Sequence, residues 1–545
     1  MPKEHGIKDV EILPIASSRA GEKFVLLICD RIGNQIQRFV VDVVVNNKVK
    51  VSSIQPIDPI AVQKPMSIAI DRDRNLWIGT SETPPQIRVF DRDGKQLDKN
   101  IELDSVAADL AIRNDELWVA KKTVPIPIYD IKGNLSGPSR YFGKSVRDVT
   151  PPGSLTAEVV TLPRAIGFDG KGNVYTMSSE ARTSYIASYN SVGRVRWRMV
   201  SNAFAISGGL TPDGNSIYSG RARLEFDGSR WNTVSVTYDP ISYPDDPRRL
   251  NEDIDSVRVF DHGRSRFVYI FLRAATALYR KDADSEILRP VGLLNCNAST
   301  RKYFDNQPEG RFYWLDTNGD AKPQATEYTR ISHDFGGDIQ GYHVDAGGGL
   351  TFGMHHKGAA RLAVSGLSNG IPQFAPLQTW RPAEPANIVR ALFDARDGRL
   401  IVSGFDQSIQ RQDGRVAGNH MVAYAVTGDQ LSRLWATPLD FGFLPDQPRG
   451  IESITLPASL DILFAGDRTS SDVLIYDPKT GEHRATIKRD TKLHGDKGSF
   501  LDVTDAVDAV RLPDGIYRVV TENVWCQNMS VYDVNIKSLL APMRK

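Results

Sequence analysis

The sequence predicts an all-β fold, and within that class a single β-propeller of about eight sheets. Alternating apolar strands recur along the chain, and each is followed by a turn with Asp, Asn or Gly and then by a second strand. Aromatic or β-branched residues stand at strand positions where sheets would pack, and long segments with helical periodicity are missing. Short antiparallel sheets repeated around an axis need this pattern, because each sheet buries both of its faces.

The repeat is clearest in the N-terminal part of the chain. The copies there are "MSIAIDRDRNLWIGT" with "QIRVFDRDG" (66–94), "LAIRNDELWVA" with "IPIYDIKG" (110–133) and "AIGFDGKGNVYTM" with "IASYNSVG" (165–193). Six further copies span 204–220, 257–272, 342–353, 391–428, 452–481 and 508–522, and the strand pair "FVLLICDRIGNQIQRFVVD" precedes them all. Two copies could share one sheet, so we expect eight blades, with seven to ten open.

The copies cover nearly the whole chain, which predicts one domain over residues 1–545. Closing the ring requires both chain ends in one sheet, so we expect the strands near 24–41 to pair with those near 508–534. Two stretches interrupt the repeat, at 225–253 and 295–340, and we interpret them as insertions between blade strands.

The repeat resembles that of the NHL and gluconolactonase (SMP-30-like) propellers. "IAIDRDRNLWIGT" and "AIGFDGKGNVYTM" carry the resemblance, with a short strand, an Asp, a Gly or Asn turn and an aromatic-led strand. The central part also looks like large bacterial propeller proteins with an inserted calcium loop. For lactonases of the related group, the resemblance implies a catalytic divalent metal held by Glu, Asn and Asp near the axis, and Glu452 is the one partial match here.

Composition excludes several classes of function. Lys and Arg number 67 against 66 Asp and Glu, so the chain has no basic field to attract nucleic acid, and no apolar run is long enough to span a membrane. Three scattered cysteines, Cys29, Cys296 and Cys526, form no metal or redox motif, although Cys29 and Cys526 could pair if the chain ends meet. Motifs of serine hydrolases, dinucleotide-binding folds, P-loops and zinc proteases are also missing.

The stretch "DTNGDAKPQATE" (316–327) has the ligand order of a calcium loop. Oxygens would come from Asp316, Asn318 and Asp320, from the backbone carbonyl of Lys322 and from the carboxylate of Glu327. Ala321 stands where glycine is expected, and positive φ at a non-glycine residue costs about 1 kcal/mol. We expect a structural Ca²⁺ on an insertion. An ion-free acidic turn is the alternative. The preceding stretch "RFYWL" predicts a strand, which excludes a two-helix calcium sensor.

A second cluster follows this loop and holds four of the nine histidines within about thirty residues. As candidate catalytic residues we take His355, His356, Tyr342 and Arg361, which would act as base, acid and carboxylate-neutralising group in a polysaccharide lyase. Histidine with the nearby aspartates could equally hold a transition metal. The competing interpretation is that these are ordinary blade and loop residues.

A third set of carboxylates lies around the last two repeats: Glu452, Asp502, Asp505, Asp508 and Glu522. Carboxylates at the start of innermost strands point toward a propeller's channel and can bind a metal or sugar hydroxyls, although Asp in a repeat more often forms a turn.

From these observations we expect a calcium-stabilised propeller that binds or scaffolds a small molecule, a carbohydrate or a protein on its loop-rich face. The alternative is an enzyme, either a polysaccharide lyase or a metal-dependent lactonase. We expect it in the periplasm or outside the cell. Its first residues show no signal peptide, although one removed earlier would leave no trace, so the cytoplasm stays open.

Overall fold

The structure is a computed structural model. It describes residues 7–14, 22–46, 48–121, 125–160, 163–180, 183–202, 208–250, 254–272, 274–296, 301–336, 339, 342–405, 418, 420–438, 451–456, 462–467, 470, 472–488, 507–523 and 528–536. Their regular secondary structure is almost entirely antiparallel strand, as predicted, and they divide into two compact units. Unit 1 comprises residues 1–149 and 155–200, and unit 2 comprises 150–154 and 201–545. None of the described residues forms a helix long and apolar enough to cross a membrane.

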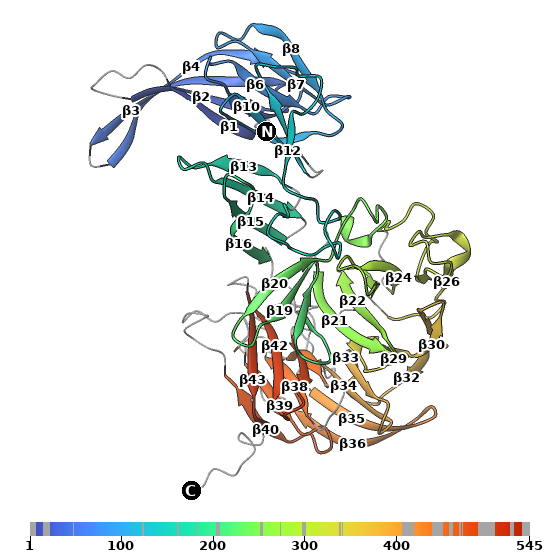
Figure 1. The fold of residues 1–545 in the computed structure, drawn as a ribbon. Helices are drawn as coiled ribbons and strands as arrows, with labels where there is room; N and C mark the ends of the chain where they lie inside the picture. Colours follow the sequence, from blue (N-terminus) through green and yellow to red (C-terminus); the bar gives the residue numbers. More distant parts are fainter. Residues whose placement is uncertain are drawn as a thin grey trace. The chain divides into compact units, whose positions relative to one another are not determined.

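Unit 1 contains four sheets of four strands each, which follow one another along the chain (Figure 1). The first is β1 (Ile7–Pro14), β2 (Glu22–Asp30), β3 (Gln35–Asn46) and β4 (Lys48–Ala61). The second is β5 (Pro65–Ile70), β6 (Leu76–Thr80), β7 (Gln86–Phe90) and β8 (Gln96–Glu102). The third is β9 (Ala107–Arg113), β10 (Glu116–Lys121), β11 (Ile126–Asp130) and β12 (Arg140–Phe142). The fourth is β13 (Ala165–Phe168), β14 (Val174–Glu180), β15 (Thr183–Tyr189) and β16 (Val195–Asn202).

Unit 2 contains six main sheets. The first is β17 (Gly209–Leu210), β18 (Ser216–Ser219), β19 (Ala222–Phe226) and β20 (Trp231–Val236). The second is β21 (Ile254–His262), β22 (Ser265–Leu272), β23 (Thr276–Lys281), β24 (Arg289–Asn295), β25 (Phe312–Leu315) and β26 (Tyr328–Arg330). The third is β27 (His343–Val344), β28 (Leu350–Gly353), β29 (Ala359–Leu362) and β32 (Gln378–Trp380), and a hairpin of β30 (Val364–Ser368) and β31 (Ile371–Phe374) precedes β32.

The remaining sheets of unit 2 are simpler. The fourth is β33 (Asn387–Asp394), β34 (Arg399–Phe405), β35 (His420–Thr427) and β36 (Gln430–Pro438). The fifth is β37 (Ile451–Thr455), β38 (Leu463–Asp467), β39 (Val473–Tyr476) and β40 (His483–Ile487), and the sixth is β41 (Val507–Arg511), β42 (Tyr517–Asn523) and β43 (Asn528–Val534). Two short 3₁₀ helices, η1 (Pro247–Leu250) and η2 (Ala325–Glu327), lie in the loops of this unit.

Each copy of the sequence repeat corresponds to one sheet, so no two copies share a blade. The nine copies and the first strand pair thus give ten sheets in the described chain, four in unit 1 and six in unit 2. This lies at the upper limit of the expected range. The contacts separate the sheets into two units, and the single domain over 1–545 stays a prediction.

The sheets of unit 2 form a closed series. Apolar cores join each sheet to the next, from the first and second sheets (Tyr218 with Val257) through to the fifth and sixth (Ile475 with Val519). One further core joins the sixth sheet back to the first, where Val520 packs with Leu210 and Ile217. Six sheets with six interfaces make a ring, which is the arrangement of a β-propeller.

This ring corrects the predicted closure by the chain ends. Strands β2 and β3 pair within the first sheet of unit 1, and β42 pairs with β41 and β43, so the segments 24–41 and 508–534 do not pair in the described residues. Packing of the last sheet on the first closes unit 2 instead. Cys29 is a buried free thiol and does not form the disulfide considered above, while Cys526 lies outside the described residues.

A carboxylate contact recurs between the innermost strands of neighbouring sheets. One oxygen accepts the N–H of the residue that follows the aspartate, and the other accepts an N–H from the next sheet. The second bond is 2.8 Å long in each case and joins Asp9 to Ile68, Asp109 to Ile166, and Asp508 to Leu210. The last of the three lies where the ring of unit 2 closes.

The insertions differ in part from their predicted bounds. Residues 225–236 contain the end of β19 and all of β20, so the first excursion comprises only 237–253. Within 295–340, β25 and β26 extend the second sheet of unit 2 as its outermost strands, and the loop 316–327 connects them. The strand predicted before that loop is therefore present.

We predict that Asp508→Ala weakens the closure of unit 2. The substitution leaves the buried N–H of Leu210 without an acceptor, and an unsatisfied buried donor costs about 1–3 kcal/mol. Urea unfolding of the full chain should show that loss. Asp514→Ala is the control, because Asp514 accepts one N–H in an exposed turn. Equal stabilities for the two variants would contradict this role of Asp508.

A second prediction concerns Asp109. Burial raises its pKa to about 7 despite the bond from Ile166, and the charges of Asp9 and Glu11 act in the same direction as burial. The folded state therefore keeps a proton that the unfolded chain releases near 3.8, so the free energy of unfolding should fall as pH rises from about 4 to about 7. Asp109→Asn should reduce this fall.

The measurement is urea unfolding at pH values from about 5 to about 8, with Asp93→Asn in an exposed turn as control. A pH profile of Asp109→Asn that overlays that of the unmodified chain would exclude the effect.

Candidate functional site

The candidate site is a pocket of about 270 Å³ in unit 2. Its lining comes from the innermost strands of five of the six sheets, or from residues directly after them: β17, β21, β27, β37 and β41. Innermost strands of a propeller surround its axis, so this is an axial pocket. Its volume is slightly below the roughly 300 Å³ at which typical ligand pockets begin, so it has room for a small molecule only.

Apolar and charged side chains share the wall of the axial pocket. The apolar ones include Leu210, Phe260, Val344, Leu456 and Val510, and the charged ones are Arg258, Asp261, Asp345, Asp508 and Arg511. A wall of this kind can hold an apolar ligand body and fix its orientation through a few polar groups.

Arg258 fixes the geometry of the pocket wall. Its guanidinium donates to the carbonyl of Val507 at 2.8 Å and lies 3.8 Å from the carboxylate of Asp508, and the side chain is 7% exposed. Arg258 belongs to the second sheet and its two partners to the sixth, so this contact reaches past the first sheet, which stands between them. The pocket therefore has a rigid wall at the point of ring closure.

The acidic residues of the pocket are also engaged by arginines of the protein. Asp345 accepts a 2.7 Å bond from Arg361, and Asp261 forms two bonds of 2.9 and 3.0 Å with Arg266. Arg511 differs, because it is exposed and has no ion-pair partner among the described residues. The pocket thus presents one cation that is available to a ligand.

His343 lies beside the pocket, next to Val344 and Asp345. Burial lowers its pKa to about 4, against the opposing effect of the nearby Asp345 carboxylate. The imidazole therefore remains neutral at ordinary pH and adds no positive charge to the site.

The structure does not bring the predicted catalytic residues together. Tyr342 stacks on Phe271 with ring centroids 5.2 Å apart in the core between the second and third sheets, whereas Arg361 lies over the ring of Phe393 in the fourth sheet. Tyr342 and Arg361 therefore lie on opposite faces of the third sheet. A single pocket cannot use both side chains.

The two adjacent histidines also separate. His355 has a buried side chain and a left-handed backbone (φ 51°), and its N–H and C=O both bond to Ile388. His356 is exposed in the following turn. The two histidines therefore lie in different environments, and neither lines the axial pocket.

The loop 316–327 folds around buried carboxylates. Asp316 accepts the N–H groups of Gly319 and Ala321, and Ala321 has the positive φ (58°) that the sequence predicts at that position. Asn318 accepts the N–H of Asp320, which in turn accepts that of Lys322. These hydrogen bonds between side-chain oxygens and backbone N–H groups fix the conformation of the loop.

Glu327 closes the loop from its far end. One oxygen accepts the N–H of Thr317 at 2.8 Å, and the other accepts the indole N–H of Trp314 at 2.9 Å. Asp316 also lies 3.5 Å from the guanidinium of Arg289, and burial raises the pKa of its carboxyl. The positive φ of Ala321 and the order of the oxygens match the calcium loop that the sequence predicts. However, the described residues contain no group of three or more His, Cys, Asp or Glu side chains placed to hold a metal.

Among the predicted axial carboxylates, Asp508 lines the pocket. Asp502 and Asp505 lie outside the described residues, as do the side chains of Glu452 and Glu522. Sequence analysis missed Arg258 and Arg511. One feature of the sequence could have indicated Arg258. It is a charged residue within the apolar innermost strand "SVRVF" of its repeat, and Asp508 stands in the corresponding strand "VDAVR" of the last repeat.

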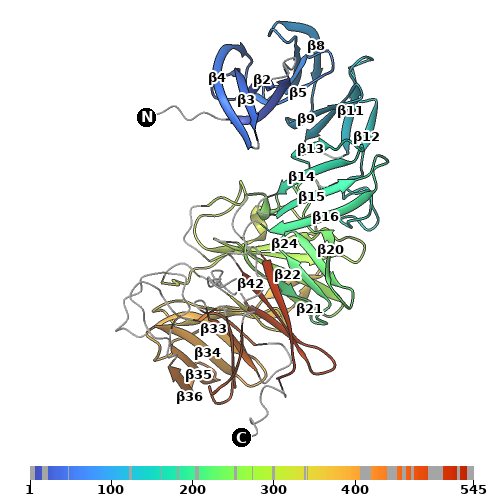
Figure 2. The ribbon, with the colours of Figure 1, turned by 90° about the vertical axis from the view of Figure 1, so that its left-hand side faces the viewer.

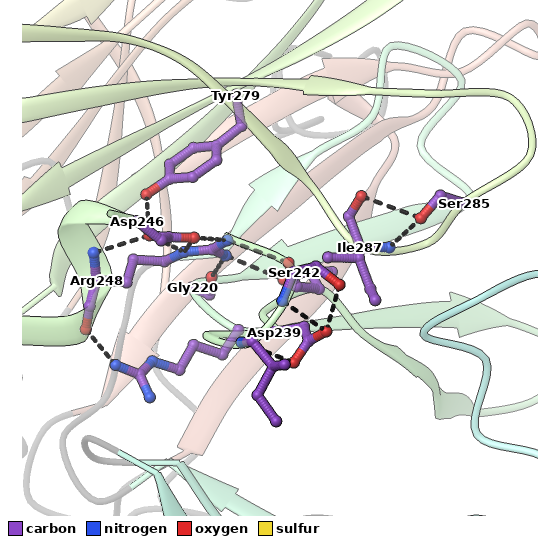
Figure 3. Close-up of polar contacts among 11 residues, drawn as sticks. Gly220, Asp239, Ser242, Asp246, Arg248, Tyr279, Ser285 and Ile287 are labelled. Atoms are coloured by element: carbon purple, nitrogen blue, oxygen red, sulfur yellow. Dashed lines mark hydrogen bonds and ion pairs between the residues drawn. The ribbon is translucent and has the colours of Figure 1, made fainter. Parts of the chain in front are cut away.

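A buried ion pair anchors the first insertion of unit 2 (Figure 3). Arg248 and Asp246 are both fully buried and lie 2.7 Å apart, and Asp246 also accepts the hydroxyl of Tyr279 at 2.8 Å. Arg248 donates to the carbonyls of Gly220 and Thr237. Loss of one partner of such a pair typically costs about 3–5 kcal/mol, so the described segment 237–250 is held firmly to the first two sheets.

Comparisons with known proteins identify no family. No family model matches the chain, and no curated protein matches it. Similar solved structures include hydrazine synthase from Kuenenia stuttgartiensis, which is 12% identical over 94% of this chain and 93% of that one, with a TM-score of 0.24. BamB from Moraxella catarrhalis is 12% identical over 94% of this chain and 96% of that one, with a TM-score of 0.22. A putative 6-phosphogluconolactonase from Bacteroides uniformis is 10% identical over 88% of this chain and 96% of that one, with a TM-score of 0.26.

These TM-scores are too low to support an argument about function. The chain is a β-propeller protein on the strength of its own sheets and of the closed series of cores in unit 2.

Proposed function

We propose that this protein binds a small organic molecule with an anionic group in the axial pocket of unit 2. Arg511 carries the proposal, because it is the exposed cation of a pocket whose other charged residues already have partners in the protein. The apolar side chains of Leu210, Val344 and Val510 would contact the rest of the ligand. A charge-assisted hydrogen bond from an arginine suits a carboxylate or phosphate.

Binding is favoured over catalysis by the placement of the residues that an enzyme would need. A lyase would require Tyr342, Arg361 and a histidine in one pocket, and the sheet separates Tyr342 from Arg361. A relationship to the NHL and gluconolactonase propellers remains our proposal from the repeat pattern, and a lactonase would additionally need a metal near the axis.

Thermal shift with a panel of small carboxylates and phosphates tests the proposal. Hydrogen bonds to charged groups contribute about 1.5–3 kcal/mol, so Arg511→Ala should weaken binding of a stabilising compound by about tenfold or more. The control is Arg264→Ala, which removes an exposed arginine outside the pocket.

Three results would contradict the binding proposal: no stabilising compound in the panel, equal affinity in the two variants, or turnover of lactones or uronate polysaccharides in the presence of calcium. Turnover would favour the enzymatic alternative.

We also propose that loop 316–327 binds one Ca²⁺, which stabilises the second sheet of unit 2. The order of its oxygens and the left-handed Ala321 support this. The strained alanine and the engagement of Glu327 by Trp314 point to weak binding, in the range of extracellular calcium modules. Such a site would be filled where calcium is plentiful, which agrees with the proposed location in the periplasm or outside the cell.

The calcium proposal predicts a higher thermal midpoint in calcium than in chelator. The stabilisation would be about 2.7 kcal/mol when free calcium exceeds the dissociation constant about one hundredfold. Asp316→Ala should abolish the difference. Asp227→Ala should retain it, because Asp227 forms a similar set of turn bonds in another hairpin. Calorimetry without a calcium-dependent shift would reject the site.

A further inference from the structure

Exposed apolar side chains concentrate at the two ends of unit 1. Thirteen of the seventeen large hydrophobic residues that are exposed in the described chain belong to its first and fourth sheets or to the turns within them. Monomeric soluble proteins rarely expose contiguous apolar patches of this kind, and such patches usually mark an interaction site.

The first patch, face A, is the side of the first sheet that packs on no other described sheet, and it is exposed except around Val41 and Val43, which are 3% and 6% exposed. It comprises Val10, Ile12, Leu26, Ile28, Phe39, Ile54 and Pro56, and the strand register places these residues side by side: Ile12 opposite Leu26, Leu26 opposite Phe39, and Phe39 opposite Pro56. Ile12 is 49% exposed and Ile54 is 59% exposed. The opposite side of the sheet, with Leu27, Cys29 and Ile36, packs on the second sheet.

The second patch, face B, is the uncovered side of the fourth sheet. It comprises Tyr175, Met177, Ile186, Trp197 and Met199. Met177 is opposite Ile186, and the rings of Tyr175 and Trp197 lie 6.1 Å apart. Met177 is 44% exposed and Met199 is 62% exposed. The opposite side of this sheet, with Val174, Ala187 and Tyr189, packs on the third sheet.

Faces A and B can pack on one another, because one is a face that would receive a preceding sheet and the other is a face that would receive a following sheet. The four sheets of unit 1 follow one another in space (Figure 2). Three cores join them in series. We call the side of a sheet that packs on the following sheet its forward face, and the side that packs on the preceding sheet its backward face. In the described part of unit 1 this series leaves two faces without a packing partner. They are face A, the backward face of the first sheet, and face B, the forward face of the fourth sheet. No core among the described residues of unit 1 joins its first sheet to its fourth.

We propose that two copies of this chain associate through unit 1, with face A of each copy packed on face B of the other. The contact continues the same sheet-on-sheet packing that already joins the four sheets. Eight sheets with eight interfaces would form a closed ring, within the usual range of about four to eight blades. The dimer is two-fold symmetric, because both new interfaces are A on B. It does not depend on the axial pocket of unit 2.

Sedimentation equilibrium of the full chain tests this proposal. The chain should be a dimer that Ile12→Glu with Ile54→Glu, or Met177→Glu with Met199→Glu, converts to a monomer with a dissociation constant at least about one hundredfold higher. Leu367→Glu with Leu434→Glu is the matched control, because these residues are equally apolar, 38% and 49% exposed, and lie outside both faces. Circular dichroism and thermal midpoints should show that all three variants remain folded.

A mixing experiment identifies the pairing of A with B. The Ile12→Glu, Ile54→Glu chain mixed with a Met177→Lys, Met199→Lys chain should recover dimers, because one interface is unchanged and the other pairs opposite charges. A monomeric unmodified chain at micromolar concentration would overturn the proposal, and it would imply that the faces are covered within one chain. A dimer that persists in both face variants, or growth into open filaments, would also overturn it.

Discussion

The constraint on which this structure depends is that every sheet has two apolar faces and must bury both. Unit 2 meets it by closure, because its sixth sheet packs back on its first through Val520, Leu210 and Ile217. Asp508 adds a directional contact to that apolar core, since its carboxylate accepts an N–H from each of the two strands that meet there. Unit 1 uses the same contact twice, at Asp9 and Asp109, but its described sheets form an open series.

Closure also makes the candidate site. The axial pocket exists because innermost strands from distant parts of the chain surround one axis, so its residues lie between positions 210 and 511. Arg258 both narrows the pocket and ties the second sheet to the sixth. Its charge and that of Asp508 are therefore largely used within the protein, whereas Arg511 is exposed and has no ion-pair partner among the described residues.

The two insertions of unit 2 are fixed by different physical means. The segment 237–253 is held by a fully buried pair, Asp246 and Arg248, whose remaining polar atoms bond to Tyr279 and to backbone carbonyls. The loop 316–327 is held by carboxylates that accept N–H groups of the loop itself, together with the indole of Trp314. The first depends on a buried ion pair, whereas the second depends on hydrogen bonds that carboxylates accept at the loop surface and in the core.

The sequence by itself determined the strands and the turns, because alternation of apolar residues and Asp or Gly turns are local properties of the chain. It left the number of sheets open between seven and ten, because pairing between strands decides which copies of the repeat share a sheet. It also determined the positive φ of Ala321, which follows from the spacing of the loop. Tertiary structure alone decided which sheets close on one another and which side chains share a pocket. Tyr342 and Arg361 are nineteen positions apart in the sequence yet lie on opposite faces of one sheet, while Arg258 and Asp508 are far apart and meet. Closure of a ring depends on packing between distant segments, and no local pattern records it.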